Sequence, residues 1–89
     1  MNYRIEIAPE AQNEIRALSG YVRAQALELF HNLSANPHLP RAKELKDKPN
    51  VYRIWLATKW RIVYEVDDEL KAILILRVRR KGQIDYESL

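Results

Sequence analysis

The second half of this chain alternates apolar and polar residues with a period of two, and this pattern constrains the fold more than any other feature. Three segments rich in Val, Ile, Tyr, Trp and Leu cover residues 51–56, 60–66 and 72–79. Runs of this kind are typical of β-strands. The links at residues 57–59 and 67–71 are short, so the three strands are predicted to form an antiparallel meander.

The first half predicts one strand and two helices. Residues 3–7 alternate apolar and charged side chains, as a half-buried strand does. Pro9 suits the first turn of a helix, because its missing N–H costs nothing there. Apolar residues at helical spacing predict helices over residues 10–18 and 21–33, and the proline-containing residues 38–50 are predicted as a loop with room for one helical turn.

Together these elements predict an α+β fold. An N-terminal strand and a helical hairpin precede the three-stranded antiparallel meander, and all strands form one sheet with the helices packed on one face. We expect residues 1–89 to be a single domain, because a chain of this length is too short for two independent cores. A chain this small hides only about 60–65% of its unfolded surface, which argues against a deep cofactor cavity and predicts no cofactor.

Several classes of site are excluded by residue type. The chain has no cysteine, so it has no disulfide, thiol nucleophile or cysteine-based zinc site. His31 and His38 lack the paired spacing of metal ligands, and residues 67–69 lack the spacing and glycine of a calcium loop, so no metal site is predicted. The longest apolar run, residues 72–76, is far shorter than the roughly 20 residues that span a bilayer. The N-terminus lacks the apolar stretch of a secretory signal, so we expect a cytoplasmic protein with no membrane partner.

Charge is unevenly distributed along the chain. Residues 1–40 carry a net charge of −1, whereas residues 41–89 carry +4. A basic half of this kind suggests a polyanionic partner, and the alternative is a solvated basic surface that binds nothing.

Strand pairing is predicted to gather arginines on one face of the sheet. Pairing Leu56 with Trp60 places Trp55 opposite Arg61 and makes Arg53 a diagonal neighbour of Arg61. A five-residue link at 67–71 pairs Val66 with Ala72 and brings Arg61 beside Arg77. The opposite face is then apolar enough to receive the helices, with Tyr52, Ile54, Leu56, Ile62, Tyr64, Leu74 and Leu76.

This mixture of residues favours binding of single-stranded RNA. Arginine binds phosphate through two parallel N–H bonds, and aromatic side chains such as Trp55 stack on unpaired bases. Arg79, Arg80 and Lys81 add further charge next to the cluster. The alternative is that each arginine covers the sheet with its methylene groups and pairs with a nearby acid.

The hairpin is also specific enough to resemble a known family. Three segments carry this resemblance: residues 45–54 with Tyr52-Arg53-Ile54, then Trp60-Arg61-Ile62-Val63-Tyr64-Glu65-Val66, and then a strand ending in Val78-Arg79-Arg80. They resemble the RelE/ParE superfamily of toxins from bacterial toxin–antitoxin systems. The resemblance covers nearly the whole chain. Its RelE branch implies an mRNA interferase: a ribosome-dependent endoribonuclease that inhibits translation by cutting mRNA in the A site without a metal. By resemblance, the 2′-hydroxyl attacks the adjacent phosphate and leaves a cyclic phosphate and a 5′-hydroxyl.

The resemblance also implies roles for individual residues. Arg53 stands where the RelE branch has a basic residue, Arg61 matches its transition-state arginine, Arg80 matches the arginine after the last long strand, and Tyr86 matches its base-stacking tyrosine. These residues form the expected catalytic set. Trp55 stands where the branch has a second lysine, so one ammonium group is missing unless Lys59 or Lys81 supplies it. The residues expected to contact RNA are Trp55, Lys59, Arg77, Arg79 and Lys81.

Two other functions are compatible with the same family. One is a ParE-like inhibitor of DNA gyrase without catalytic residues, and the other is an inactive member that only binds its antitoxin. The joint presence of Arg61, Arg80 and Tyr86 favours the ribonuclease. All three functions imply a cognate antitoxin whose acidic residues cover the arginines. The ribonuclease adds the ribosome and mRNA as partners, with no small-molecule cofactor.

Overall fold

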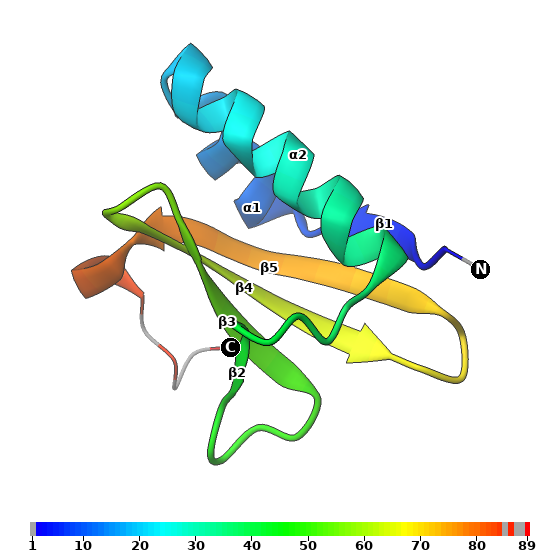
Figure 1. Cartoon of the computed structure of the whole chain (residues 1–89). Coiled ribbons are helices and arrows are strands. Elements are labelled where there is room, and N and C mark those ends of the chain that lie inside the picture. Colours follow the sequence, from blue (N-terminus) through cyan, green and yellow to red (C-terminus); the bar gives the residue numbers. More distant parts are fainter. Residues whose placement is uncertain (1, 85, 87–88) are drawn as a thin grey trace.

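The computed structural model describes residues 2–84, 86 and 89, which form a five-stranded sheet with two helices on one face (Figure 1). The elements in chain order are β1 (Arg4–Ile7), α1 (Pro9–Arg16), α2 (Gly20–Ala35), β2 (Lys43–Glu44), β3 (Val51–Leu56), β4 (Trp60–Asp67), β5 (Ala72–Arg80) and the short 3-10 helix η1 (Lys81–Gln83). The predicted α+β fold, with one sheet and helices on one face, is confirmed.

The strand order is β1-β5-β4-β3-β2, with β1 parallel to β5 and every other pair antiparallel. Residues 38–50 form the predicted loop except at β2, which was not predicted, and the segment contains no helical turn. β2 pairs Lys43 with Arg53 and Glu44 with Tyr52. A strand of two residues is too short to show a periodic pattern, and it forms here because β3 offers it a free edge.

Local signals set the boundaries of the helices. Pro9 occupies the first turn of α1, as expected, and the Ser19 hydroxyl caps α2 by accepting a hydrogen bond from the backbone N–H of Val22 at 3.4 Å. The Arg23 guanidinium of α2 reaches back to the end of α1, where it donates at 2.8 to 3.2 Å to the carbonyls of Ile15, Arg16 and Leu18. Since the last carbonyls of a helix have no partner within it, Arg23 both caps α1 and joins the two helices.

The pairing of β3 with β4 follows the predicted register, whereas that of β4 with β5 does not. Leu56 pairs with Trp60, and Trp55 with Arg61. On the other side of β4, Asp67 pairs with Ala72, so the connecting turn is one residue shorter than predicted. A β-bulge between Val63 and Tyr64 then shifts the register by one more residue. The prediction that Arg77 lies beside Arg61 was therefore wrong.

The two shifts changed which β5 side chains enter the core. A slip of one residue turns side chains to the opposite face. Between the turn and the bulge, Ile73 and Ile75 are therefore buried against the helices, and the prediction that Leu74 and Leu76 face the core was wrong. Beyond the bulge, Val78 is buried again. Of the β3 and β4 residues predicted for this face, Ile54, Leu56, Ile62 and Tyr64 belong to the core and Tyr52 packs against it.

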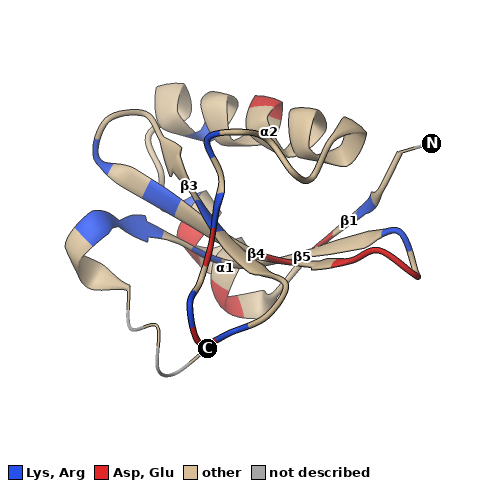
Figure 2. Cartoon of the chain, turned by 60° about the horizontal axis from the view of Figure 1, so that its bottom comes forward, with Lys and Arg blue, Asp and Glu red and all other residues tan. Residues whose placement is uncertain are grey.

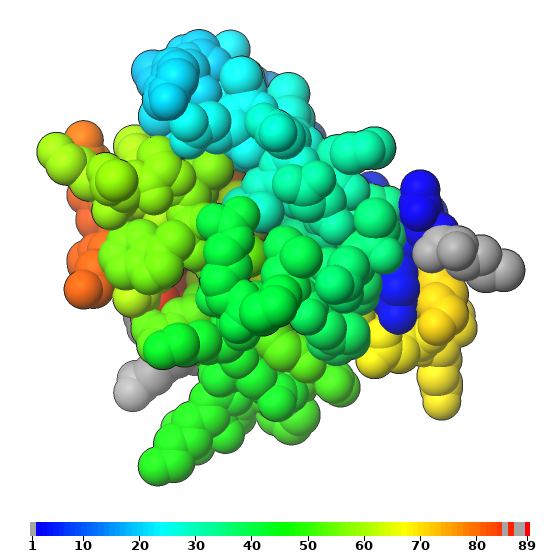
Figure 3. Space-filling view, viewed as in Figure 1, coloured from blue at the N-terminus to red at the C-terminus, as the bar shows by residue number. Residues whose placement is uncertain are grey.

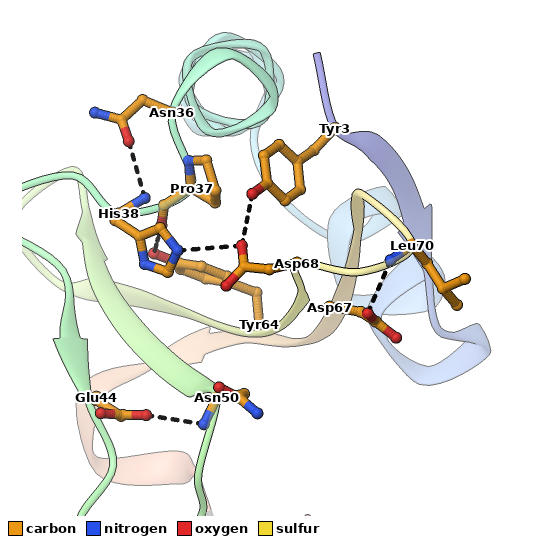
Figure 4. A network of polar contacts seen from close by, with 10 residues as sticks. All are labelled: Tyr3, Asn36, Pro37, His38, Glu44, Asn50, Tyr64, Asp67, Asp68 and Leu70. Atoms are coloured by element: carbon orange, nitrogen blue, oxygen red, sulfur yellow. Dashed lines mark hydrogen bonds and ion pairs between the residues drawn. The ribbon is translucent and has the colours of Figure 1, made fainter. Parts of the chain in front are cut away.

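A polar network ties together three segments that are distant in sequence (Figure 4). The Tyr3 hydroxyl donates to Asp68 Oδ1 at 2.5 Å, and His38 Nε2 lies 3.4 Å from the same oxygen. The Tyr64 hydroxyl donates to the Pro37 carbonyl oxygen at 3.0 Å, and burial raises the pKa of Tyr64. The network thus fastens the N-terminal segment and the segment after α2 to the β4–β5 turn.

Replacing the buried tyrosine tests this network. We expect Tyr64→Phe to lower the free energy of unfolding by about 1–3 kcal/mol, because it leaves the Pro37 carbonyl without its donor. Urea denaturation of the two proteins measures the change. Tyr21→Phe is the matched control, since Tyr21 is 73% exposed and its change should be close to zero. Equal effects of the two substitutions would contradict the role of the Tyr64 hydroxyl.

The contacts of Asp68 predict that the stability of the fold depends on pH in the acid range. The hydrogen bond from Tyr3, and then the contact with His38, hold the pKa of Asp68 below the ordinary value of 3.8. A carboxylate with a lowered pKa stabilises the fold fully above its unfolded pKa, and this contribution disappears as pH falls through the folded pKa. The difference in unfolding free energy between wild type and Asp68→Asn should therefore shrink below pH 3.8. A difference that stays constant from neutral to acid pH would exclude this linkage.

Candidate functional site

The face of the sheet opposite the helices, the open face, carries most of the predicted site. The register places Val51, Arg53 and Trp55 of β3 on this face, together with Arg61 and Val63 of β4. Figure 2 shows lysines and arginines gathered at the end of the sheet that holds the β3–β4 hairpin tip and η1, whereas acidic residues follow the β4–β5 turn at the other end. The basic half of the sequence thus becomes a basic end of the molecule.

Arg61 lies at the centre of this basic end. Its Nη1 donates to the Tyr86 hydroxyl at 3.1 Å, and its guanidinium carbon lies 4.5 Å from the centre of the Trp55 ring. These two contacts hold the guanidinium in one orientation. An arginine has five N–H donors, and within the described residues only the bond to Tyr86 uses one of those of Arg61. The remaining donors are available to an anion.

A small pocket of about 70 Å³ opens beside Arg61. It is far smaller than the roughly 300–1,000 Å³ of pockets that enclose drug-sized ligands, so it suits a single anionic group better than a whole nucleotide. Four cationic side chains and no carboxylate stand among its described lining residues, which are Arg41, Lys43, Arg53, Ile54, Trp55 and Arg61. The pocket is therefore a candidate phosphate site.

Arg41 and Lys43 were not predicted as site residues. β2 brings Lys43 opposite Arg53, and Arg41 comes just before this strand. The visible signal was the run of basic residues at positions 41, 43, 46 and 48, but a loop assignment gave no reason to place any of them next to β3.

Lys81 and Arg80 are adjacent in sequence but lie at different aromatic side chains. Lys81 Nζ is 5.5 Å from the centre of the Trp55 ring, so Lys81 joins the open-face cluster. Arg80 pairs with Trp60, and its guanidinium carbon is 5.3 Å from the centre of the Trp60 ring. Because Trp60 packs against the core on the helix side of the sheet, the structure does not bring Arg80 next to Arg61.

Two further arginines of β5, expected to contact RNA, are paired with α1. Arg77 Nη1 lies 3.8 Å from a carboxylate oxygen of Glu10. Arg79 Nε donates to Glu14 Oε2, while the backbone N–H of Val78 donates to Glu14 Oε1 at 2.9 Å. The alternative that arginines pair with nearby acids therefore holds for these two. Arg53 and Arg61 form no ion pair with any described residue.

Two further kinds of feature, a metal-binding cluster and a membrane-spanning helix, were sought in the described part of the chain. Residues 2–84, 86 and 89 contain no cluster of three or more His, Asp or Glu side chains that could hold a metal ion. None of the helices in these residues has both the length and the apolar character that crossing a membrane requires.

The sequence matches the family described as "ParE toxin of type II toxin-antitoxin system, parDE" over residues 5–85. This chain belongs to the RelE/ParE superfamily of toxins. The toxin is 30% identical, over its whole length and 94% of the relative, to an Escherichia coli protein described as a RelE-like toxin.

Solved structures of RelE proteins share the fold of this toxin. The E. coli RelBE toxin–antitoxin complex matches with a TM-score of 0.79 and 26% identity, covering 88% of the toxin and 95% of the solved chain. The archaeal RelE–RelB complex from Pyrococcus horikoshii matches with a TM-score of 0.80 and 26% identity, covering 94% and 100%. The resemblance that the hairpin residues suggested is thus confirmed at the level of the superfamily.

Glu14 is expected to contribute to the stability of the fold, and this contribution can be measured separately from RNA binding. Its side chain is 14% exposed and accepts both the Val78 N–H and the Arg79 guanidinium. Glu14→Ala should lower the free energy of unfolding of the toxin by about 1–3 kcal/mol, because a backbone donor loses its partner. Glu10→Ala is the control and should cost about 1 kcal/mol or less, because Glu10 is 61% exposed and its ion pair is long. Thermal and urea unfolding measure both, and equal losses would contradict the assignment.

Proposed function

We propose that this toxin is an endoribonuclease that cuts messenger RNA in the ribosomal A site without a metal ion and so inhibits translation. The observation that carries the proposal is the position of Arg61, which Tyr86 and Trp55 hold beside a pocket lined by four cations. Preorganised positive charge of this kind stabilises the charge that develops on a phosphate during cleavage. The RelE-like relative and the RelE structures support the same choice.

In the proposed reaction the scissile phosphate occupies the pocket, where Arg53 and Arg61 donate hydrogen bonds to its non-bridging oxygens. The 2′-oxygen forms a bond to phosphorus while the bond from phosphorus to the 5′-oxygen breaks. The 2′-hydroxyl gives its proton to solvent water and the 5′-oxygen takes a proton from solvent water, so the products are a cyclic phosphate and a 5′-hydroxyl. Arginines stay charged because the guanidinium pKa exceeds about 12, so these two residues act through charge and position rather than by accepting the proton.

The surrounding residues have separate roles in this proposal. Trp55 and Tyr86 stack on or orient the bases next to the scissile bond, since aromatic faces accept any base. Lys81, which lies at the Trp55 ring, is the cation that neutralises the leaving oxygen. Arg80, which the resemblance includes in the catalytic set, lies instead at Trp60 on the helix side of the sheet.

The second candidate function is inhibition of DNA gyrase. The observation that favours it is the family match, because the description of the matching family names the ParE toxin. In this case the cations would bind a protein or DNA surface and no RNA would be cut. Expression of the toxin separates the two, since a ribonuclease arrests translation rapidly and a gyrase inhibitor causes a DNA damage response with filamentation.

We also propose a cognate antitoxin as partner and the cytoplasm as the site of action. RelE has been solved in complex with its antitoxin RelB in the E. coli and Pyrococcus structures. Acidic side chains of such a partner would neutralise the pocket cations and exclude RNA from them.

The cleavage proposal predicts a large effect of one substitution. On ribosomes programmed with a defined message, Arg61→Ala should reduce the cleavage rate by roughly 10²- to 10³-fold, because the transition state then has one donor fewer. Primer extension maps the cut sites and gives the rates. Arg4→Ala is the charge-matched control: Arg4 is exposed, pairs with Glu6 and lies at the acidic end of the sheet, so its variant should cleave like wild type.

Two results would reject the proposal. One is undiminished cleavage by the Arg61→Ala variant. The other is a wild-type toxin that leaves the message intact on the ribosome while it inhibits purified gyrase, which would establish the second candidate instead.

A further inference from the structure

Trp60 and Arg80 form a second cationic and aromatic surface on the helix side of the sheet end, and together with Lys59 of the adjoining hairpin turn they are called the Trp60 surface. Trp60 is half-buried at the rim of the core, and the Arg80 guanidinium carbon lies 5.3 Å from its ring centre. Lys59 precedes Trp60 in the hairpin turn and is exposed. An arginine stacked on a tryptophan keeps its N–H groups directed outward for an anionic ligand.

The charges of the Trp60 surface are not compensated within the described part of the chain. Arg77 and Arg79, which precede Arg80 on the same strand, each pair with a carboxylate of α1. No ion pair to a described residue is formed by Lys59, Arg80 or Lys81. Like charges held close together destabilise a fold, so their retention here indicates an anionic partner.

The Trp60 surface is continuous with the open-face pocket. The backbone N–H of Lys81 donates to the carbonyl of Lys59 at 3.1 Å, while Lys81 Nζ lies at the Trp55 ring on the open face. Figure 3 shows the side chains of the hairpin tip, in light green, beside those of η1, in orange. A band of cations therefore runs from the pocket, over the hairpin tip, to Arg80 and Trp60.

We propose that the Trp60 surface binds nucleotides that flank the scissile phosphate, so that a single RNA strand passes from the pocket around the hairpin tip to the helix side. The inference deepens the proposed function and rests on it for the position of the scissile phosphate. An unpaired RNA strand fits this band better than an acidic peptide does, because two tryptophans beside arginine or lysine, one on each face, provide stacking for bases as well as charge for phosphates. An acidic peptide would use only the charge.

The test measures how affinity depends on RNA length. Oligouridylates with 2′-O-methyl groups cannot be cut, so binding of a labelled trinucleotide and a nonanucleotide can be followed by fluorescence anisotropy with the full chain. Wild type should bind the nonanucleotide at least tenfold more tightly than the trinucleotide. The Lys59→Ala/Arg80→Ala variant should bind the trinucleotide like wild type but lose most of this gain. Its slope of log affinity against log salt for the nonanucleotide should also be shallower, by about 0.7 for each phosphate that the variant no longer neutralises.

A second measurement does not depend on the charge substitutions. In the Trp55→Phe variant, Trp60 is the only tryptophan, so its fluorescence reports on this surface alone. The nonanucleotide should quench it by stacking, and the trinucleotide should not. Arg4→Ala is the control for removal of an exposed arginine and should leave the dependence on length intact.

Three outcomes overturn the proposal. The first is equal affinity of wild type for the two lengths, the second is an unchanged gain in the double variant, and the third is quenching of Trp60 by poly-glutamate but not by the nonanucleotide, which would assign the surface to a protein. These results are independent of cleavage. A toxin that cuts message but shows no gain with length refutes only the Trp60 surface, and one that gains with length but never cuts message refutes only the ribonuclease.

Discussion

The pairing of β4 with its two neighbours is the constraint on which the rest of the structure depends. In this register Trp55 stands opposite Arg61 on one face, while Leu56, Trp60 and Arg80 align on the other. Alternate side chains of one short hairpin therefore complete the core on one side and build a cation-lined pocket on the other. A slip of one residue would bury Arg61 and expose Ile62, so the core and the site enforce the same register.

The basic end of the molecule shows how the fold treats cations differently according to position. Arg23 caps α1, and Arg79 is neutralised by Glu14, so both serve the structure. Arg53 and Arg61 instead face a pocket whose described lining contains no acid. Arg53 and Arg61 are therefore the better candidates for binding an anion, because an arginine that is already paired with a carboxylate has fewer free N–H donors for a ligand.

Much of the candidate site could be predicted from the hairpin alone. Its three-residue turn determined the β3–β4 register, which placed Arg53, Trp55 and Arg61 together on the strength of the sequence. The β5 residues could not be placed in this way, because a bulge at Val63 and Tyr64 leaves no mark on the alternation of apolar residues. Arg41 and Lys43 were missed for a related reason, since a two-residue strand has no period.

The sequence by itself determined the α+β class, the helical hairpin, the meander and the superfamily, because these follow from local periodicity, short turns and a hairpin motif. Only the tertiary structure decided which of the other cations join Arg53 and Arg61. Lys81 meets Trp55 while Arg80 meets Trp60, and Arg77 and Arg79 reach α1, because the position of each side chain depends on the cumulative register of two strand pairs and on the helix packed beside β5. Such contacts join residues that are distant in the chain, so no local pattern contains them.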